Sequence, residues 1–368
     1  MRVLTVVGNR PQFVKAAAVS GHLRERAVET LVHTGQHYDR ELSAVFFEEL
    51  GLPPPDHRLG VGSGSHARQT AATMARLEPL AVAERPDAML VYGDTNATLA
   101  AALVAAKLNI PLAHIEAGMR SFDRTMPEEV NRIVADRLGG LLLCSTEAAV
   151  ANLRAEGMAK RARLVGDVMA DVAIAFGPLA ERRSEVHSRL GLVRGDYLVA
   201  TLHRVANVDE PGALRRAAGL LATTAERHGP LVWPLHPRTR ARLAELGLDE
   251  SLAAAPGVVP IEPLGYLDFT CLVRGARAVL TDSGGLQKEA YLAGVPCLTL
   301  REETEWVETV ETGWNRVVGL DADLALRSLG ELLERRRAES PDPDLYGRGD
   351  AGRRCVRELL AWGAANAS

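Results

Sequence analysis

The stretch His114–Arg132, HIEAGMRSFDRTMPEEVNR, joins an expected strand (Ile110–Ile115) to an expected helix that begins near Pro127. It places carboxylates and guanidinium groups where a strand meets a helix. Carboxylates crowded at the carboxyl ends of parallel strands often handle protons or bind hydroxyl groups, because repulsion and partial burial shift their pKa values toward neutrality. The charged residues are Glu116, Arg120, Asp123, Arg124, Glu128, Glu129 and Arg132. The alternative is a solvated loop before a helix whose first glutamates complement its dipole.

Asp94 follows an expected strand (Ala88–Tyr92) and precedes an expected helix (Ala97–Ala106). If this strand and the one before Glu116 belong to one parallel sheet, the two carboxylates lie at the same sheet edge. Two interpretations of Asp94 are therefore open. It is either a catalytic carboxylate or only the N-cap of the helix that follows.

Strands and helices alternate through the chain, which predicts an α/β fold with two Rossmann-like, doubly wound parallel-sheet domains. The first is expected over 1–168 and the second over 169–350, with a connection around 165–184 where the rhythm loosens. A C-terminal amphipathic helix is expected to return to the first domain, which then also includes about 351–368. The other expected strands are Arg2–Val7, Glu29–His33, Gly139–Cys144, Tyr197–Leu202, Leu231–Pro234, Val258–Ile261, Ala278–Thr281 and Cys297–Leu300.

The composition, 47% hydrophobic and 24% charged over 368 residues, is typical of a globular enzyme. A formal net charge of -4 argues against a nucleic-acid-binding surface. No apolar run approaches the ~20 residues that span a bilayer and no leader precedes the first strand, so a cytoplasmic protein without a membrane partner is expected. His33 and His37 have metal-ligand spacing, but Gly35 interrupts them and no HExxH is present, so no metal is expected.

The first strand–helix turn reads GNRPQFVK (8–15), with a single glycine where a nicotinamide-binding turn has GxGxxG. No NAD is therefore expected. Arg10 and Lys15 instead indicate an anion at this turn. The alternative is a local salt bridge of Arg10 and a solvated Lys15.

In the second half, TDSGGLQKEA (281–290) opens a helix directly after a strand. Its small residues leave backbone N–H groups and the positive end of the helix dipole open to a phosphate. Glu289, one turn later, is placed to bind the hydroxyls of a ribose. His203 adds a donor at the same sheet edge. The alternatives are an ordinary capping turn and a structural histidine.

Together these stretches resemble the non-hydrolysing UDP-N-acetylglucosamine 2-epimerases. The matching segments follow the family's order over nearly the whole chain: GNRPQFVK, TGQHYD, GDTNAT, HIEAGMRSFDRTMPEEVNR, TLHRVAN, PLGYLDF, TDSGGLQKEA and LREETEW. The resemblance implies a glycosyltransferase-B type of fold with the sugar nucleotide in the interdomain cleft. It also implies a homodimer that interconverts UDP-GlcNAc and UDP-ManNAc without NAD or a metal.

The resemblance implies roles for individual residues. The catalytic groups would be Asp94, Glu116, Glu128, Arg10, Lys15, Arg132 and His203. The substrate would be bound by Arg10, His203, Phe269, Ser283, Gly284, Gly285, Glu289 and Arg301. A second, activating UDP-GlcNAc site of bacterial members would involve Gln36, His37, Arg68 and Gln69. Ala206 stands where the family commonly has the glutamate of HRxEN, so regulation through that site is an open question.

The implied reaction explains the residue types. The C2 hydrogen is not acidic, so a carboxylate would remove it while UDP leaves across C1–C2, and a glycal would remain. Return of a proton from the opposite face requires more than one carboxyl group, and cations would hold the departing diphosphate. The rival functions are a glycosyltransferase of the same fold, a hydrolysing 2-epimerase that releases ManNAc and UDP, and a catalytically silent sugar-nucleotide-binding regulator.

Overall fold

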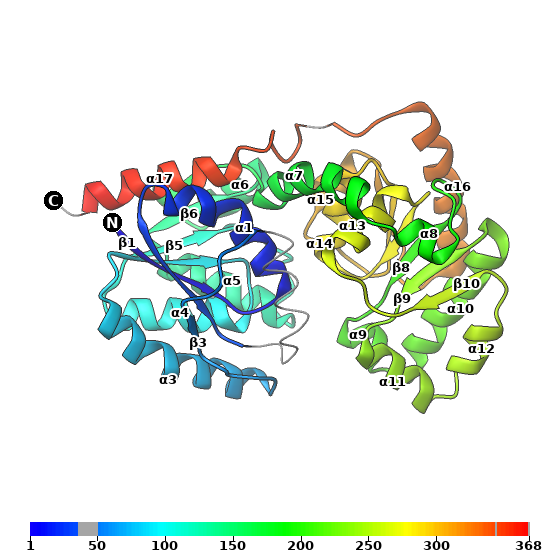
Figure 1. The fold of residues 1–368 in the computed structure, drawn as a ribbon, viewed down its shortest axis with the longest axis horizontal. Helices are drawn as coiled ribbons and strands as arrows, with labels where there is room; N and C mark the ends of the chain where they lie inside the picture. The colour runs from blue at the N-terminus through cyan, green and yellow to red at the C-terminus, as the bar shows by residue number, and fades with distance from the viewer. Residues whose placement is uncertain (36–50, 343, 367–368) are drawn as a thin grey trace. The chain divides into compact units, whose positions relative to one another are not determined.

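The computed structural model describes residues 1–35, 51–342 and 344–366. It divides into two compact units, Met1–Ala175 with Pro343–Ser368, and Phe176–Asp342. Figure 1 shows the helices and strands of both. The division falls between Ala175 and Phe176, inside helix α7 (Val168–Arg183). The stretch where the rhythm was expected to loosen is thus largely one helix.

The first unit contains a parallel sheet of seven strands among the described residues, in the order β3-β2-β1-β4-β5-β6-β7. The central strands are apolar runs buried on both faces, the usual composition of a covered parallel sheet. The strands are β1 (Arg2–Val7), β2 (Val28–His33), β3 (His57–Arg58), β4 (Ala88–Tyr92), β5 (Leu112–Ile115), β6 (Leu141–Cys144) and β7 (Ala162–Leu164).

Helices cover both faces of this sheet. Figure 1 shows α1 (Arg10–Arg24) and α17 (Ala351–Asn366) on one side and α3 (His66–Glu84) and α4 (Asn96–Lys107) on the other. Each face has its own buried apolar cluster, and the second includes Ala135 of α5 (Pro127–Leu138). α6 (Glu147–Ala155) precedes β7, and a short 3-10 turn, Ala159–Arg161, connects them. Because α17 packs against α1, the predicted return of the C-terminal helix to the first unit is confirmed.

The close packing of α17 on α1 depends on Gly352, where a side-chain methyl group would collide with the carbonyl oxygen of Ala18. We expect Gly352→Ala to lower the free energy of unfolding by about 1–3 kcal/mol, the usual cost of overpacking. The matched control is Gly219→Ala in α10, where nothing lies within 4 Å of the added carbon. There alanine is expected to stabilise the helix by roughly 0.5–1 kcal/mol. Denaturant unfolding measures both changes, and unchanged stability of Gly352→Ala would contradict the prediction.

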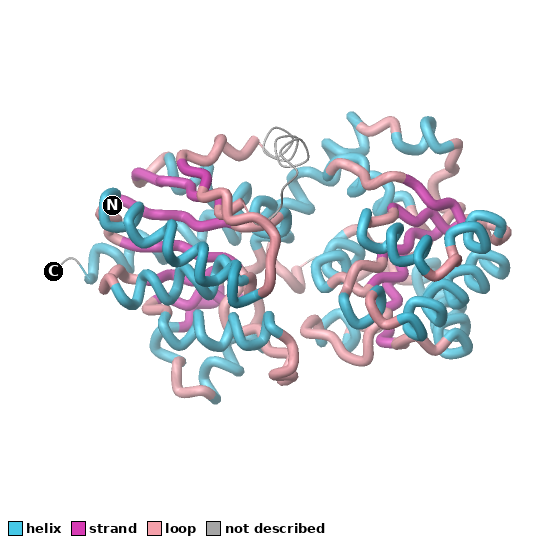
Figure 2. The backbone as a smooth tube through the Cα atoms, turned by 90° about the horizontal axis from the view of Figure 1, so that it is seen from below, coloured by secondary structure: helices cyan, strands magenta, loops and turns pink. Residues whose placement is uncertain are grey.

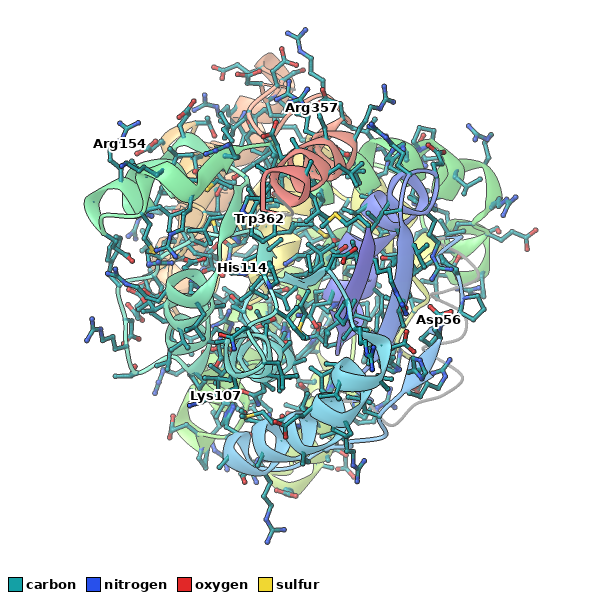
Figure 3. The ribbon with its side chains drawn as sticks, turned by 90° about the vertical axis from the view of Figure 1, so that its left-hand side faces the viewer. Asp56, Lys107, His114, Arg154, Arg357 and Trp362 are labelled. Atoms are coloured by element: carbon teal, nitrogen blue, oxygen red, sulfur yellow. The ribbon has the colours of Figure 1, made fainter. Side chains whose placement is uncertain are left out.

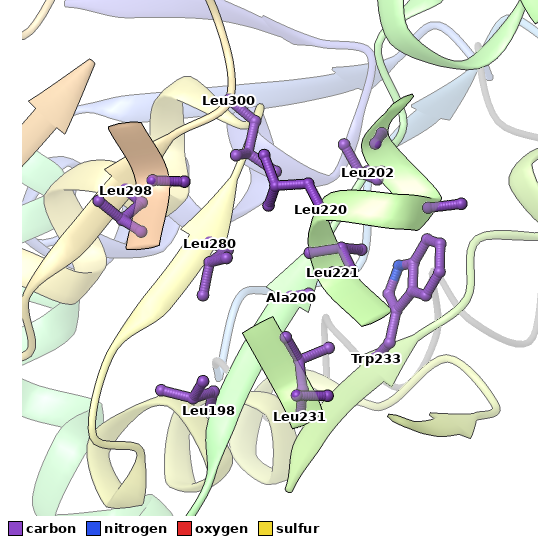
Figure 4. Close-up of a cluster of buried hydrophobic side chains, with 14 of the residues drawn as sticks. Leu198, Ala200, Leu202, Leu220, Leu221, Leu231, Trp233, Leu280, Leu298 and Leu300 are labelled. Carbon is purple, nitrogen blue, oxygen red and sulfur yellow. The ribbon is translucent and has the colours of Figure 1, made fainter. Parts of the chain in front are cut away.

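The second unit has a parallel sheet of six described strands in the order β10-β9-β8-β11-β12-β13. Figure 4 shows its core, in which leucines from neighbouring strands and Trp233 pack against leucines of α10. The strands are β8 (Leu198–Thr201), β9 (Leu231–Pro234), β10 (Val258–Ile261), β11 (Val279–Thr281), β12 (Cys297–Thr299) and β13 (Asn315–Val317). The helices are α8 (Val186–Leu190), α9 (Val205–Val208), α10 (Pro211–His228), α11 (Pro237–Glu245), α12 (Asp249–Ala254), α13 (Tyr266–Gly275), α14 (Gly284–Leu292), α15 (Val307–Glu311) and α16 (Ala322–Ala338).

The predicted fold class is confirmed, since both units are parallel sheets covered by helices (Figure 2). The edge strands β3, β7 and β13 were not among the expected strands, because each has only two or three residues and lacks a continuous apolar run. β5 and β6 begin two residues later than the expected starts at Ile110 and Gly139. No helix in the described part of the chain combines the length and the apolar composition that crossing a membrane requires.

Candidate active site

The candidate site of the first unit lies where β4 and β5 end. Tyr92 and Ile115 are paired in the sheet, and the next residues leave the same edge. Glu116 has a φ of 69°, a left-handed backbone that a non-glycine residue adopts at about 1–3 kcal/mol. Its N–H donates to the carbonyl of Leu143 at 3.0 Å, which holds this conformation. Strained backbone of this kind is concentrated at functional sites.

Lys15 of α1 forms an ion pair with the Glu116 carboxylate, and both side chains are almost completely buried. Gly93 makes room for the pair, because a Cβ there would lie 3.0 Å from Glu116 Oε2 and from Lys15 Nζ. The alternative of a solvated Lys15 is therefore wrong. Arg10 begins α1, and its side chain lies outside the part of the structure that is described.

Asp94 forms an ion pair with Arg132 of α5. Its carbonyl accepts a hydrogen bond from Asn131 Nδ2 at 2.9 Å. The interpretation of Asp94 as the N-cap of α4 is wrong, because Thr95 is the N-cap and accepts from the N–H of Thr98. The Asp94 side chain is 33% exposed whereas that of Arg132 is 3% exposed, so the carboxylate is accessible and its cation is not.

Two adjacent glutamates of α5 lie in different surroundings. Glu129 is buried, and its carboxylate accepts from the N–H groups of Ser121 (2.9 Å) and Phe122 (3.1 Å) and from Arg132 Nη1 (3.0 Å). The solvated-loop interpretation is therefore wrong for Glu129 and Arg132. Glu128 is partly exposed, and within the described residues it makes no hydrogen bond or ion pair. It is the accessible carboxylate of the two.

Gln12 is a site-forming residue that sequence analysis missed. Its side chain accepts from the N–H of Gly8 (2.7 Å) and donates to the carbonyl of Tyr92 (2.6 Å) and to Thr98 Oγ1 (2.9 Å). It thereby connects the end of β1 to the end of β4. The available signal was a polar residue directly before the apolar Phe13 and Val14 in the first turns of the helix.

The residues predicted for a second, activating site are only partly described. Gln36 and His37 lie outside the described residues. Arg68 is exposed on α3, and Gln69 accepts from Asn96 Nδ2 at 2.8 Å. Ala206 lies in α9 of the other unit. The activating site remains a prediction.

In the second unit, the turn at 283–285 follows β11. Ser283 is the N-cap of α14 and accepts from the N–H of Leu286 at 3.5 Å, so the capping interpretation is confirmed. Gly284 is buried, whereas Gly285 is exposed and has nothing within 4 Å of its Cβ position. The first turn of α14 is therefore capped and still open to an anion. Glu289 follows one turn later and is partly buried.

Asp282 is fully buried beside this turn and organises the segment after β8. Its carboxylate accepts from the N–H groups of His203 (3.1 Å) and Arg204 (3.0 Å) and from Asn207 Nδ2 (3.2 Å). Burial alone would raise the pKa of Asp282, but the hydrogen bond and charge of His203 and the backbone donors lower it. His203 Nδ1 lies 3.1 Å from this carboxylate, yet the His203 side chain is 45% exposed. It therefore has a structural partner and is also accessible to a ligand.

The remaining predicted ligands of the second unit lie in other elements. Phe269 is partly buried in α13. Arg301 Nη1 is 2.8 Å from Glu305 Oε2, and a methyl group on Gly284 would collide with the Glu305 carboxylate. Glu305 was not among the predicted site residues, although it lies in the LREETEW segment. Its ion pair places the Arg301 guanidinium close to the first turn of α14.

Metal binding has no visible basis in the described chain, where no three His, Cys, Asp or Glu side chains are grouped as an ion would require. His33 lies in β2, and its possible partner at position 37 is not described. Independence of metal and of NAD remains a prediction.

A family model described as UDP-N-acetylglucosamine 2-epimerase matches residues 22–360. The chain is 44% identical to a UDP-2,3-diacetamido-2,3-dideoxy-D-glucuronate 2-epimerase of Pseudomonas aeruginosa, over 98% of this chain and 99% of that protein. It is 38% identical to a UDP-N-acetylglucosamine 2-epimerase of Methanocaldococcus jannaschii, over 99% of this chain and 100% of that protein.

Solved structures are similar over almost the whole chain. The M. jannaschii UDP-GlcNAc 2-epimerase in complex with UDP-GlcNAc and UDP has a TM-score of 0.92 at 39% identity and covers 98% of this chain and 100% of its own. The UDP-GlcNAc 2-epimerase of Neisseria meningitidis bound to UDP-GlcNAc has a TM-score of 0.90 at 28% identity, with the same coverage.

Proposed function

The chain belongs to the UDP-N-acetylglucosamine 2-epimerase family, and from this premise we propose that it interconverts UDP-N-acetylglucosamine and UDP-N-acetylmannosamine without hydrolysing them. One observation carries the proposal. Three carboxylates, those of Asp94, Glu116 and Glu128, come from the end of β4, the end of β5 and the start of α5, and two of them are paired with the cations Lys15 and Arg132. This is a set of groups suited to proton transfer.

The chemistry follows from the poor acidity of C2. A carboxylate removes the C2 proton as the bond between C1 and the diphosphate oxygen breaks, so that UDP takes the bonding electrons and a C1–C2 double bond forms. A carboxyl group on the other face then returns a proton to C2 while the same UDP oxygen attacks C1. No electrons are gained or lost overall, so the proposed reaction does not need NAD as an electron carrier.

The proposal assigns proton transfer to groups of the first unit and diphosphate binding to groups of the second. The Glu116 carboxylate, held in a strained backbone beside Lys15, is the strongest candidate for contact with the reacting carbon. In the second unit, the first turn of α14 and the exposed His203 would bind the diphosphate, because backbone N–H groups and a helix N-terminus stabilise an anion without a metal.

Incubation of the protein with UDP-GlcNAc in D₂O, without an acceptor or added metal, tests the function. We expect deuterium at C2 of both UDP-sugars by NMR, since the proton exchanges with solvent in the intermediate. Retention of the original hydrogen after long incubation would refute the proposal. Stoichiometric release of ManNAc and UDP would identify a hydrolysing enzyme. UDP release only in a parallel incubation with an added sugar acceptor would identify a glycosyltransferase. Light scattering of the same sample tests the proposed homodimer.

A second candidate substrate is UDP-2,3-diacetamido-2,3-dideoxy-D-glucuronic acid, favoured by the 44% identity to the P. aeruginosa epimerase that is named for this sugar. The same elimination and re-addition at C2 applies to it. Comparison of kcat/KM for the two UDP-sugars decides between them.

A further inference from the structure

Behind the carboxylates of the first unit lies a buried charged network that the proposed chemistry does not use. His114 of β5 and Asp136 of α5 are both completely buried, and His114 Nδ1 donates to Asp136 Oδ1 at 2.8 Å. Arg120 Nη1 donates to the other oxygen, Asp136 Oδ2, at 2.7 Å. In Figure 3 His114 lies in the interior of the unit, whereas Arg154 and Arg357 lie at the periphery. We call these three residues the His114–Asp136–Arg120 network.

One contact of the network reaches the segment after β4. His114 Nε2 donates to the carbonyl of Gly93 at 2.7 Å, directly before Asp94. His114 thus has an acceptor at each ring nitrogen, the Asp136 carboxylate on one side and the Gly93 carbonyl on the other. The ring therefore connects Asp136 to the backbone that carries Asp94.

Another contact reaches the segment after β5. The N–H of Gly118 donates to Asp136 Oδ2 at 3.1 Å, two residues beyond Glu116. Gly118 has a φ of 80°, and a side-chain methyl group there would collide with the carbonyl of Ala149, so this close approach requires glycine. The carboxylate of Asp136 thus holds the turn in which Glu116 adopts its strained conformation.

The connection from Asp136 to Glu128 is the backbone of α5 itself. Both residues belong to this helix, and Glu128 lies in its first turn. Burial alone would raise the pKa of Asp136, but the hydrogen bond and charge of His114 and the charge of Arg120 lower it. A buried, ionised carboxylate with directional partners defines geometry more narrowly than apolar packing does.

We propose that Asp136, acting through His114 and the N–H of Gly118, is a positioning residue. It holds the three proton-transferring carboxylates in fixed positions relative to one another. The proposal rests on the proposed function. Asp136 does not touch the substrate. Its contribution is that one side chain restrains all three elements from which Asp94, Glu116 and Glu128 project.

The test compares Asp136→Asn with wild type in the epimerisation assay. Asparagine keeps the size of the side chain but removes the charge and one acceptor. We expect kcat to fall roughly 10- to 100-fold, because displacements near 1 Å have effects of this size. The KM and the Kd for UDP are expected to change less than about threefold. The contacts that bind the ground state and the transition state equally well are retained.

The matched control is Asp171→Asn in the same unit. The Asp171 carboxylate accepts from the N–H groups of Ala351 (3.1 Å) and Gly352 (2.7 Å) at the start of α17 and contacts none of the candidate active-site residues. Both variants are expected to lower the Tm, but only Asp136→Asn is expected to lower kcat. Equal kcat in both, or a parallel loss of kcat and UDP affinity in Asp136→Asn, would overturn the positioning role.

A second variant tests the proposal if Asp136→Asn does not fold. His114→Gln removes the ring between Asp136 and Gly93 but leaves the Arg120 and Gly118 contacts, so a partial loss of kcat at unchanged UDP affinity is expected. Wild-type kcat in this variant would overturn the proposal.

If the wild-type protein leaves UDP-sugars unchanged, the proposed function is wrong, but the structural role of Asp136 can still be tested. Amide hydrogen exchange over 114–121 then tests the network by itself. Faster exchange in Asp136→Asn than in Asp171→Asn supports restraint of this turn, and equal exchange refutes it.

Discussion

Glu116→Gln is expected to lower kcat by roughly 10²- to 10⁴-fold, the range that a positioned acid or base contributes. Glutamine has the same shape and can still accept a hydrogen bond from Lys15, but it cannot take or return a proton. UDP affinity is expected to change little, because the candidate nucleotide-binding residues, His203 and the first turn of α14, belong to the second unit. Steady-state kinetics and calorimetry with UDP measure the two effects.

The matched control for this variant is Glu147→Gln, at the exposed start of α6 in the same unit. It has the same change in charge and is expected to keep wild-type kcat. Because Glu116→Gln leaves Lys15 buried beside a neutral partner, thermal unfolding is needed to show that the variant is folded at the assay temperature. A folded Glu116→Gln protein with wild-type turnover would remove Glu116 from the mechanism.

Glu128→Gln is expected to affect mainly turnover and Glu129→Gln mainly stability, although the residues are adjacent. Glu128 is partly exposed, so its replacement should lower kcat by roughly 10²-fold or more and leave stability nearly unchanged. Glu129 is buried and accepts from two backbone N–H groups and from Arg132. Its replacement should lower the free energy of unfolding by about 1–3 kcal/mol, because a buried donor loses its charged acceptor.

Turnover and denaturant unfolding of both variants provide this comparison. Glu129→Gln is also expected to lose some kcat, since its carboxylate orients the guanidinium that pairs with Asp94. The decisive quantity is kcat under conditions where both proteins are folded. If Glu128→Gln keeps full turnover, the accessible carboxylate of α5 has no role in proton transfer.

The alternation of apolar strands and amphipathic helices was sufficient to predict two parallel sheets. Each element leaves its own pattern of apolar residues in a short stretch of sequence, because it buries one face or both. Polar residues directly after strands also predicted the edge at which Asp94 and Glu116 lie, since parallel strands end at one edge. The ordered motifs then indicated the family, which the matching family model confirms.

Local pattern was not sufficient to determine the partner of each polar side chain. Adjacent glutamates in MPEEVNR look alike in the sequence, and only burial against residues 121 and 122 separates the accessible Glu128 from the buried Glu129.

The fold class, the family and the sheet edges at which chemistry was expected could all be predicted from the sequence, because they depend on the period and order of residues along the chain. The tertiary structure alone decided that Lys15 pairs with Glu116, 101 positions away, and that His114 and Asp136 lie behind the site. Such contacts depend on helix placement and register across the sheet, and therefore on the packing of the whole unit.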